Sequence, residues 1–161
     1  MSERTDAEKQ VEESAETINS EKFLVFSIME KSYCLPSRLI GEIALFDAVY
    51  PLPLMPSYIL GIVNRYSTPY ALFDTGLLLQ KTPCPRKKVL ILKEEIDKVA
   101  FLIDDITAIA DIQNDEILTI EKKSGSDEFT DGINASFKWN KDDVFILDVN
   151  KILNRVSEEL L

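Results

Sequence analysis

The side chains that carry most enzyme chemistry are scarce in this sequence. It contains no histidine, which removes histidine-based nucleophile dyads, histidine metal ligands and phosphohistidine relays. Its two cysteines, Cys34 and Cys84, do not have the CxxC spacing of a metal or redox site, and we expect both to be reduced thiols. Only five glycines are present, and they form no phosphate-binding loop. The sequence therefore predicts a protein that is not an enzyme and that uses no cofactor.

The sequence has two pairs of adjacent carboxylates that could be considered as ligands of a metal ion, Asp104/Asp105 and Asp142/Asp143. Neighbouring side chains on a strand point to opposite faces, so the members of each pair diverge. We interpret them as solvated charges and not as ligands of a cation.

The segment GIVNRYSTPYALFD, residues 61–74, has the pattern of a β-hairpin with two apolar strands around a polar centre. Arg65, Tyr66 and Ser67 occupy the turn, where a two-residue Asn-Gly turn would suffice. Arginine and tyrosine are enriched at protein interfaces, which favours a contact surface over an ordinary exposed turn. A residue other than glycine in a left-handed conformation costs roughly 1–2 kcal/mol. We therefore expect the turn that contains Ser67 to differ in shape from a turn with glycine at this position.

The charge of the chain indicates which partners it avoids. The formal net charge is -10 and the isoelectric point is about 4.5, which opposes binding to nucleic acid or to anionic lipid. No apolar run approaches the roughly 20 residues that span a bilayer, and no basic and apolar leader begins the sequence. We expect a cytoplasmic protein that binds other proteins and does not insert into a membrane.

The periodicity of apolar residues predicts a mostly β fold with short helices. Strands are expected at residues 23–29 and 32–35, at 59–63 and 70–73, and in two further runs from residue 88 onward. Ser37 is expected to cap a short helical turn. The apolar loop residues Leu52, Leu54 and Met55 are expected to cover a core. Val149, Ile152, Leu153 and Val156 have helical spacing and predict a packed C-terminal helix.

Two of the predicted hairpins are similar to each other. Residues 61–74 and the segment GINASFKWNKDDVFILD, residues 132–148, both read Gly-Ile, strand, polar turn, strand and Asp. Either any two hairpins look this much alike, or the chain forms two similar β lobes, for which small barrels are the expected architecture. We therefore divide the chain into a flexible acidic tail (1–21), one domain of two intertwined β-barrel lobes (22–157) and a C-terminal end (158–161).

Several segments in this order resemble the CheW-type chemotaxis coupling proteins, from about Lys22 to Asn154. The segments are FLVFSIMEKSYCLPSRLIGEI, PLPLMPSYILGIVN, ALFD, VAFLIDDI and the terminal GI…VFILDVNKIL. The resemblance implies two five-stranded β-barrel lobes and no enzymatic activity. It also implies an adaptor that ties the cytoplasmic tips of chemoreceptors to the histidine kinase CheA, through its regulatory domain, in membrane-associated arrays. Other CheW-like domains are possible partners in the rings of such arrays.

Two alternatives remain open on the sequence alone. The chain could be a divergent scaffold of another sensory pathway, or a paralogue that fills ring positions with altered receptor coupling. From a different class, it could be a small β-barrel ligand-binding domain or enzyme, for which a deep polar pocket with converging carboxylates would be diagnostic.

One departure from the family falls in the hairpin turn. The family usually reads Asn-Leu-Arg-Gly where this chain has Asn64, Arg65, Tyr66 and Ser67, so that Tyr66 stands at the position of the family's arginine. Tyrosine cannot replace arginine ionically, although it can supply aromatic area and a hydroxyl group. Arg65 could take over only if the turn is irregular, because adjacent strand residues point to opposite faces.

The remaining candidate contact residues lie outside this turn. Ile40 and Ile43 are either core or contact residues, whereas Glu42 between them is expected to face solvent. Gly61 is expected to permit close approach of another backbone segment. Ile106 and Ile109 either line the receptor groove or fill a barrel, and Trp139 is expected to be exposed. The candidate protein-binding residues are therefore Ile40, Glu42, Ile43, Gly61, Asn64, Arg65, Tyr66, Ile106 and Ile109.

Overall fold

The computed structural model describes residues 19–45, 48–85, 88–120 and 132–160. Most of the expected tail, up to residue 18, lies outside the described residues, and the first strand begins at Ser20. The final helix extends to Leu160, so it includes most of the expected C-terminal end. The elements are β1 (Ser20–Ile28), β2 (Lys31–Pro36), η1 (Ser37–Leu39), β3 (Ile40–Leu45), β4 (Ile59–Arg65), β5 (Thr68–Asp74), α2 (Thr75–Gln80), β6 (Lys88–Leu92), β7 (Val99–Ile103), β8 (Asp105–Gln113), η2 (Asn114–Glu116), β9 (Leu118–Thr119), β10 (Ile133–Trp139), β11 (Asp142–Leu147) and α3 (Val149–Leu160).

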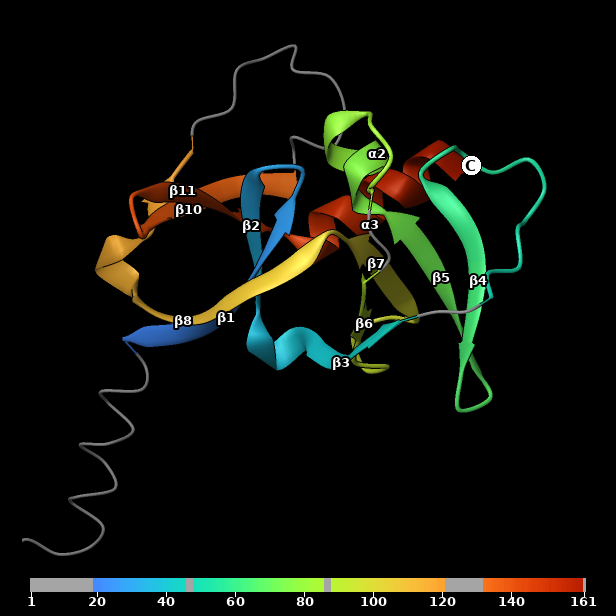
Figure 1. Cartoon of the computed structure of the whole chain (residues 1–161), viewed down its shortest axis with the longest axis horizontal. Helices are drawn as coiled ribbons and strands as arrows, with labels where there is room; N and C mark the ends of the chain where they lie inside the picture. Colours follow the sequence, from blue (N-terminus) through green and yellow to red (C-terminus); the bar gives the residue numbers. More distant parts are fainter. Residues whose placement is uncertain (1–18, 46–47, 86–87, 121–131, 161) are drawn as a thin grey trace, which may run out of the picture.

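The strands form two sheets that lie side by side, the first on the left and the second on the right of Figure 1. The first sheet has the strand order β8-β1-β2-β11-β10-β9, and the second has the order β3-β6-β7-β5-β4. The prediction of a mostly β fold in two lobes is thereby confirmed. The first sheet has six strands and not five because the two-residue strand β9 pairs with β10.

The two sheets repeat one arrangement of five strands. In the first sheet, the edge strand β8 pairs with the hairpin β1–β2, and β2 pairs in parallel with β11 of the hairpin β10–β11. In the second sheet, the edge strand β3 pairs with the hairpin β6–β7, and β7 pairs in parallel with β5 of the hairpin β4–β5. The two segments compared in the sequence are the second hairpins of the two lobes, and each is followed by a helix. Their similarity therefore reflects two lobes of the same topology.

Three of the four hairpins, β1–β2, β4–β5 and β10–β11, turn through two residues without glycine. Both residues of each of these turns have positive φ: Met29 and Glu30, Tyr66 and Ser67, and Asn140 and Lys141. Two left-handed residues in succession define the type I′ turn, whose twist matches that of the strands it connects. Ser67 adopts the left-handed conformation with φ of 66°, which is costly for a residue other than glycine. The expectation that its turn differs in shape from a turn with glycine at this position stays a prediction.

The largest hydrophobic cluster is shared by both sheets and by α3. Strand β1 contributes Leu24, Phe26 and Ile28, while β7 contributes Phe101 and Ile103. The alternate residues of β1, including Phe23 and Val25, enter a second cluster within the first sheet. Both faces of β1 are therefore buried, which explains its continuous apolar run.

Helices α2 and α3 each begin at an aspartate, which is the last residue of β5 in one case and directly follows β11 in the other. The Asp74 carboxylate accepts a hydrogen bond from the backbone N–H of Leu77 at the start of α2, and Asp148 accepts one from Lys151 at the start of α3. By contrast, Ser37 makes no cap: it is the first residue of η1, whose N-cap is Pro36. None of the helices in these described ranges is long and apolar enough to cross a bilayer.

Candidate functional site

Three of the candidate contact residues meet at one corner of the second sheet. Arg65, at the end of β4, donates from Nε to Oε2 of Glu42 on β3 over 3.0 Å, and a second N–H donates to Oε1. The strands β3 and β4 are the two edge strands of this sheet, so the ion pair joins its edges. A bidentate arginine–carboxylate pair also fixes the orientation of both side chains.

Tyr66 completes the corner. The guanidinium carbon of Arg65 lies 4.7 Å from the centre of the Tyr66 ring, a distance at which cation–π attraction acts. The Tyr66 side chain remains 83% exposed. The corner, which consists of Glu42, Arg65 and Tyr66, thus presents an aromatic ring to solvent over a guanidinium that is already oriented.

The ion pair changes the proton affinity of both partners. The hydrogen bond from Arg65 lowers the pKa of Glu42 below its ordinary value of 4.5, and the same bond raises the pKa of Arg65 above its ordinary value. Both groups are therefore charged throughout the neutral pH range. Glu42 was expected to face solvent freely, but its side chain is only 31% exposed because Arg65 covers it.

The corner forms on a regular turn. Arg65 pairs with Thr68 in the hairpin register, and only Tyr66 and Ser67 lie between them. The turn is thus not irregular, and the expectation that Arg65 takes over the contact of the family's arginine only through an irregular turn stays a prediction. A long arginine side chain at the last strand position reaches both the neighbouring edge strand and the ring beside it.

Gly61 permits the close approach of another backbone segment, as predicted. Its φ is +143°, and a Cβ atom at this position would lie 2.2 Å from the backbone oxygen of Tyr50. Tyr50 crosses here to exchange two backbone hydrogen bonds of 2.8 Å with Ile62. Gly61 is buried and contributes through its backbone, whereas Asn64 of the same strand is exposed opposite Pro69.

The four candidate isoleucines divide into two half-buried and two exposed positions. Ile40 and Ile106 are half-buried against the shared core, while Ile43 is 45% and Ile109 is 66% exposed. Residues directly opposite in an antiparallel pair share a face of the sheet. Ile43 is opposite Leu90 and Ile109 is opposite Leu24, both of which belong to the shared core.

Ile43 and Ile109 therefore lie on edge strands of different sheets, on the faces that turn toward the shared core. The two sheets are also joined by an ion pair of 2.6 Å between Lys88 of β6 and Asp105 of β8. Lys88 is opposite Leu45, which is 72% exposed. One polar pair thus connects the second lobe, at the strand position opposite an exposed leucine, to the edge strand of the first lobe that carries Ile109.

The sequence and the two-lobed fold were both compared with known proteins. The family model described as a CheW-like domain matches residues 22–157. The chain belongs to the CheW-like family. Among solved structures, the fold is similar to that of the scaffolding protein TtCheW from Thermoanaerobacter tengcongensis, with a TM-score of 0.70 and 18% sequence identity over 79% of this chain and 88% of that one. The comparison with curated proteins gives no match.

The CheW-like chain carries an exposed apolar loop that the sequence was expected to bury. We call residues 48–57, between β3 and β4, the proline loop. Leu54 is 102% exposed, while Leu52 and Met55 are each 40% exposed, so the expectation that these residues cover a core is wrong. The loop contains three prolines and no charged residue. These three side chains have residue types typical of a core, and no local pattern in the sequence signals their exposure.

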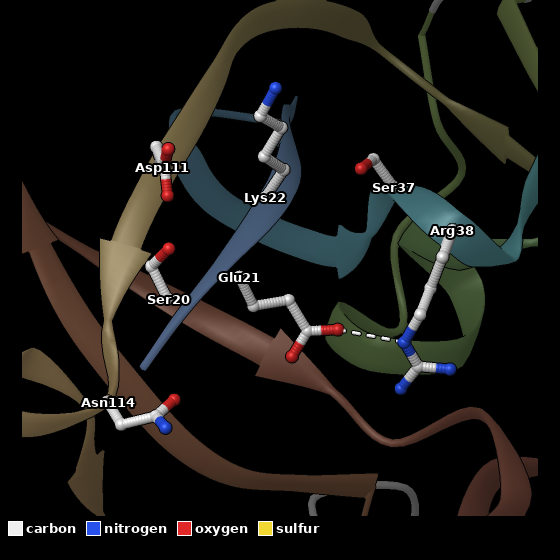
Figure 2. A pocket seen from close by; sticks show the side chains of 7 residues that line it. All are labelled: Ser20, Glu21, Lys22, Ser37, Arg38, Asp111 and Asn114. Atoms are coloured by element: carbon white, nitrogen blue, oxygen red, sulfur yellow. Dashed lines mark hydrogen bonds and ion pairs between the residues drawn. The ribbon is translucent and has the colours of Figure 1, made fainter. Parts of the chain in front are cut away.

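The described residues line several cavities, which bear on the alternative of a ligand-binding domain or enzyme with converging carboxylates in a deep polar pocket. One of about 490 Å³ is lined by polar residues of β1, η1 and β8. Figure 2 shows that the Glu21 carboxylate turns to Arg38, at 2.9 Å from its Nε, and away from Asp111. Its two carboxylates therefore do not converge on one point. The other predicted carboxylate pairs are divided in the same way, because Asp105 contacts Lys88 and Asp143 contacts Lys138.

Trp139 also differs from its expected place in the CheW-like fold. It was expected to be exposed, but it is half-buried against the second cluster, which contains Phe137 and Val144. Its position at the end of β10 directs the ring over the open end of this cluster. Trp139 therefore belongs to the packing of the first sheet.

Proposed function

We propose that this protein is a non-catalytic adaptor that couples transmembrane chemoreceptors to the histidine kinase CheA in signalling arrays. The observation that carries the proposal is the CheW-like match, which extends over residues 22–157 and thus includes both lobes. The similar protein TtCheW is a scaffolding protein. An adaptor must present more than one surface, and two lobes of one topology supply two such surfaces. The protein works in the cytoplasm, at the membrane-bound receptors.

The corner of Glu42, Arg65 and Tyr66 is the first proposed contact surface. Its ring and guanidinium are of the residue types that concentrate binding energy at interfaces, and their mutual contact reduces the entropy that binding would cost. Tyr66 then contributes aromatic area at the position where the family has arginine. Asn64, exposed on the same hairpin, belongs to this surface.

The apolar positions between the lobes form the second proposed contact surface. Ile43 and Ile109 supply exposed area, Ile40 and Ile106 form its half-buried base, and the backbone at Gly61 holds the neighbouring loop in place. A receptor's cytoplasmic tip is helical, and apolar side chains at helical spacing suit such a surface. The proline loop supplies further apolar area for a second CheW-like domain, such as the kinase's regulatory domain.

Pull-down experiments with the isolated regulatory domain of CheA and with receptor cytoplasmic fragments, both from the same organism, test the proposal. We expect both to bind, and we expect Tyr66→Arg to change the affinity for one of them by about tenfold or more, equivalent to about 1.4 kcal/mol. Ser67→Ala, at the neighbouring exposed position, is the matched control and leaves both affinities unchanged. Failure of the wild-type protein to bind either partner would overturn the adaptor function.

A ring-filling paralogue with altered receptor coupling is the second candidate, because Tyr66 replaces the arginine typical of the family. It predicts binding to the kinase domain or to other CheW-like domains without binding to receptor fragments. The same pull-down experiment separates the two candidates. Binding of a small molecule with loss of both protein contacts would instead favour a ligand-binding domain.

A further inference from the structure

The proline loop is held only at its ends. At the first end, Tyr50 forms two backbone hydrogen bonds with Ile62. At the second, the backbone oxygen of Pro56 accepts a hydrogen bond of 3.0 Å from Ile59. Residues 51–55 form no hydrogen bond with the described part of the chain. The direction in which the loop presents Leu54 is therefore determined by the two anchored ends.

The second end is fixed by Tyr58. Its side chain is 7% exposed, and its ring stacks against Phe73 with a centroid distance of 6.3 Å. Its backbone oxygen accepts a hydrogen bond of 2.8 Å from Asp74, so the residue is fixed to β5 on its main-chain side. The hydroxyl group at the other end of the ring donates to Oε2 of Glu159 over 2.6 Å.

Glu159 comes from the other lobe. It lies in the last turn of α3, the helix that follows β11 of the six-stranded sheet and runs toward the five-stranded sheet (Figure 1). Val149, Ile152 and Val156 fix this helix in the shared core. The bond from Tyr58 to Glu159 thus connects the end of the proline loop to a rigid element of the opposite lobe.

We propose that Glu159 positions the proline loop through Tyr58, so that the C-terminal helix of one lobe determines how the other lobe presents its apolar loop to a partner. The positioning rests on the contacts above, and its consequence for partner binding rests on the proposed function. Glu159 acts here as a positioning residue: its side chain accepts the hydrogen bond from Tyr58, is paired with Arg155, and lines one pocket with Pro56 and Ser57 at the end of the loop.

A spin label on the loop tests the positioning directly. The label is attached at Leu54→Cys in the full chain carrying Cys84→Ser, because Cys34 is fully buried and does not compete for the reagent. We expect Tyr58→Phe and Glu159→Ala to increase the mobility of the label in its electron paramagnetic resonance spectrum. Glu159→Gln keeps an acceptor oxygen for the tyrosine and is expected to retain most of the wild-type line shape.

Tyr70→Phe is the matched control. It also removes a tyrosine hydroxyl from the second sheet, one that contacts Glu94 at 3.4 Å and not the helix. An unchanged line shape in Tyr58→Phe and Glu159→Ala, with unchanged melting temperature, would overturn the proposal, as would an equal change in Tyr70→Phe.

Affinity for the kinase's regulatory domain is measured with the same variants. We expect Tyr58→Phe and Glu159→Ala to weaken it by about threefold to tenfold, while Glu159→Gln stays near the wild type. If the wild-type protein binds no such domain, the proposed function fails, and the line shapes still decide whether Glu159 positions the loop. If the label becomes mobile but the affinity is unchanged, the loop is no contact surface and the inference about partner binding is wrong.

Discussion

Arg65 and Glu42 form a two-bond ion pair between β4 and β3, the two outermost strands of the five-stranded sheet. The pair connects residues 23 positions apart in the sequence and brings the exposed ring of Tyr66 into the same corner. Because both partners are only about one-third exposed, the pair is better ordered than a typical surface salt bridge. It therefore has a structural effect that can be measured apart from any partner.

The pH dependence of stability isolates this ion pair. The pKa of Glu42 is lower in the folded protein than its ordinary value of 4.5, so its stabilising contribution is complete above that value and is lost as the pH falls through the lowered pKa. We expect the urea midpoint of the wild type to exceed that of Glu42→Gln at pH 7, and we expect this difference to shrink progressively as the pH falls below 4.5. Glu30→Gln, in an exposed turn, should show no such difference, and a constant offset at all pH values would contradict the assignment.

Gly61→Ala tests the close crossing of Tyr50. A Cβ atom would lie 2.2 Å from a backbone oxygen at a φ that disfavours alanine, so we expect a loss of at least 1–3 kcal/mol, on the order of the cost of a strained backbone conformation. Gly41→Ala is the control, since its Cβ atom would meet its nearest neighbour at 3.4 Å. Chemical denaturation of both variants gives the comparison. Equal losses in the two would show that the crossing imposes no special constraint.

Ser67→Gly is expected to stabilise the protein. Ser67 has a φ of 66°, and glycine adopts this left-handed conformation without the steric cost of a Cβ atom, which should stabilise the folded state by about 1 kcal/mol. The greater flexibility of glycine in the unfolded chain offsets part of this gain. The same substitution at Thr68, the first residue of β5, should instead destabilise, because glycine weakens a strand. Thermal unfolding of the two variants should therefore shift in opposite directions.

Phe101→Ala tests whether the lobes unfold together. Phe101 lies in β7 of the second sheet and is fully buried in the shared core, so its truncation should cost about 3–5 kcal/mol. Trp139, in the first sheet, reports the unfolding of the other lobe by fluorescence. We expect its transition to shift together with the circular dichroism transition. Independent lobes would leave the Trp139 transition unshifted.

The strands, the terminal helix and the similarity of the two hairpins were predictable from the sequence because they depend on local periodicity. Leu24 and Phe26 alternate with Phe23 and Val25, and all four are buried, which is why β1 reads as one continuous apolar run. The parallel pairing of β2 with β11 connects residues more than a hundred positions apart. No local pattern encodes that register, so the repeated strand order became visible only in three dimensions.

The candidate site was predicted in its members and not in its geometry. Glu42, Arg65 and Tyr66 were each named from residue type or family position, but their contact depends on the closeness of two edge strands. The proline loop and the bond between Tyr58 and Glu159 were missed for different reasons. Leu54 is apolar and thus appeared to be a core residue, while the second contact joins residues 101 positions apart.

The core that both sheets share has a mechanical consequence. Bending between two lobes requires a thin connection, whereas here Phe26 and Phe101 belong to one close-packed cluster that resists deformation. A push on the tip of the β4–β5 hairpin would move the far end of the six-stranded sheet along with it. A molecule of this stiffness would transmit a force applied at one lobe by changing its tilt as a whole, without bending between its lobes.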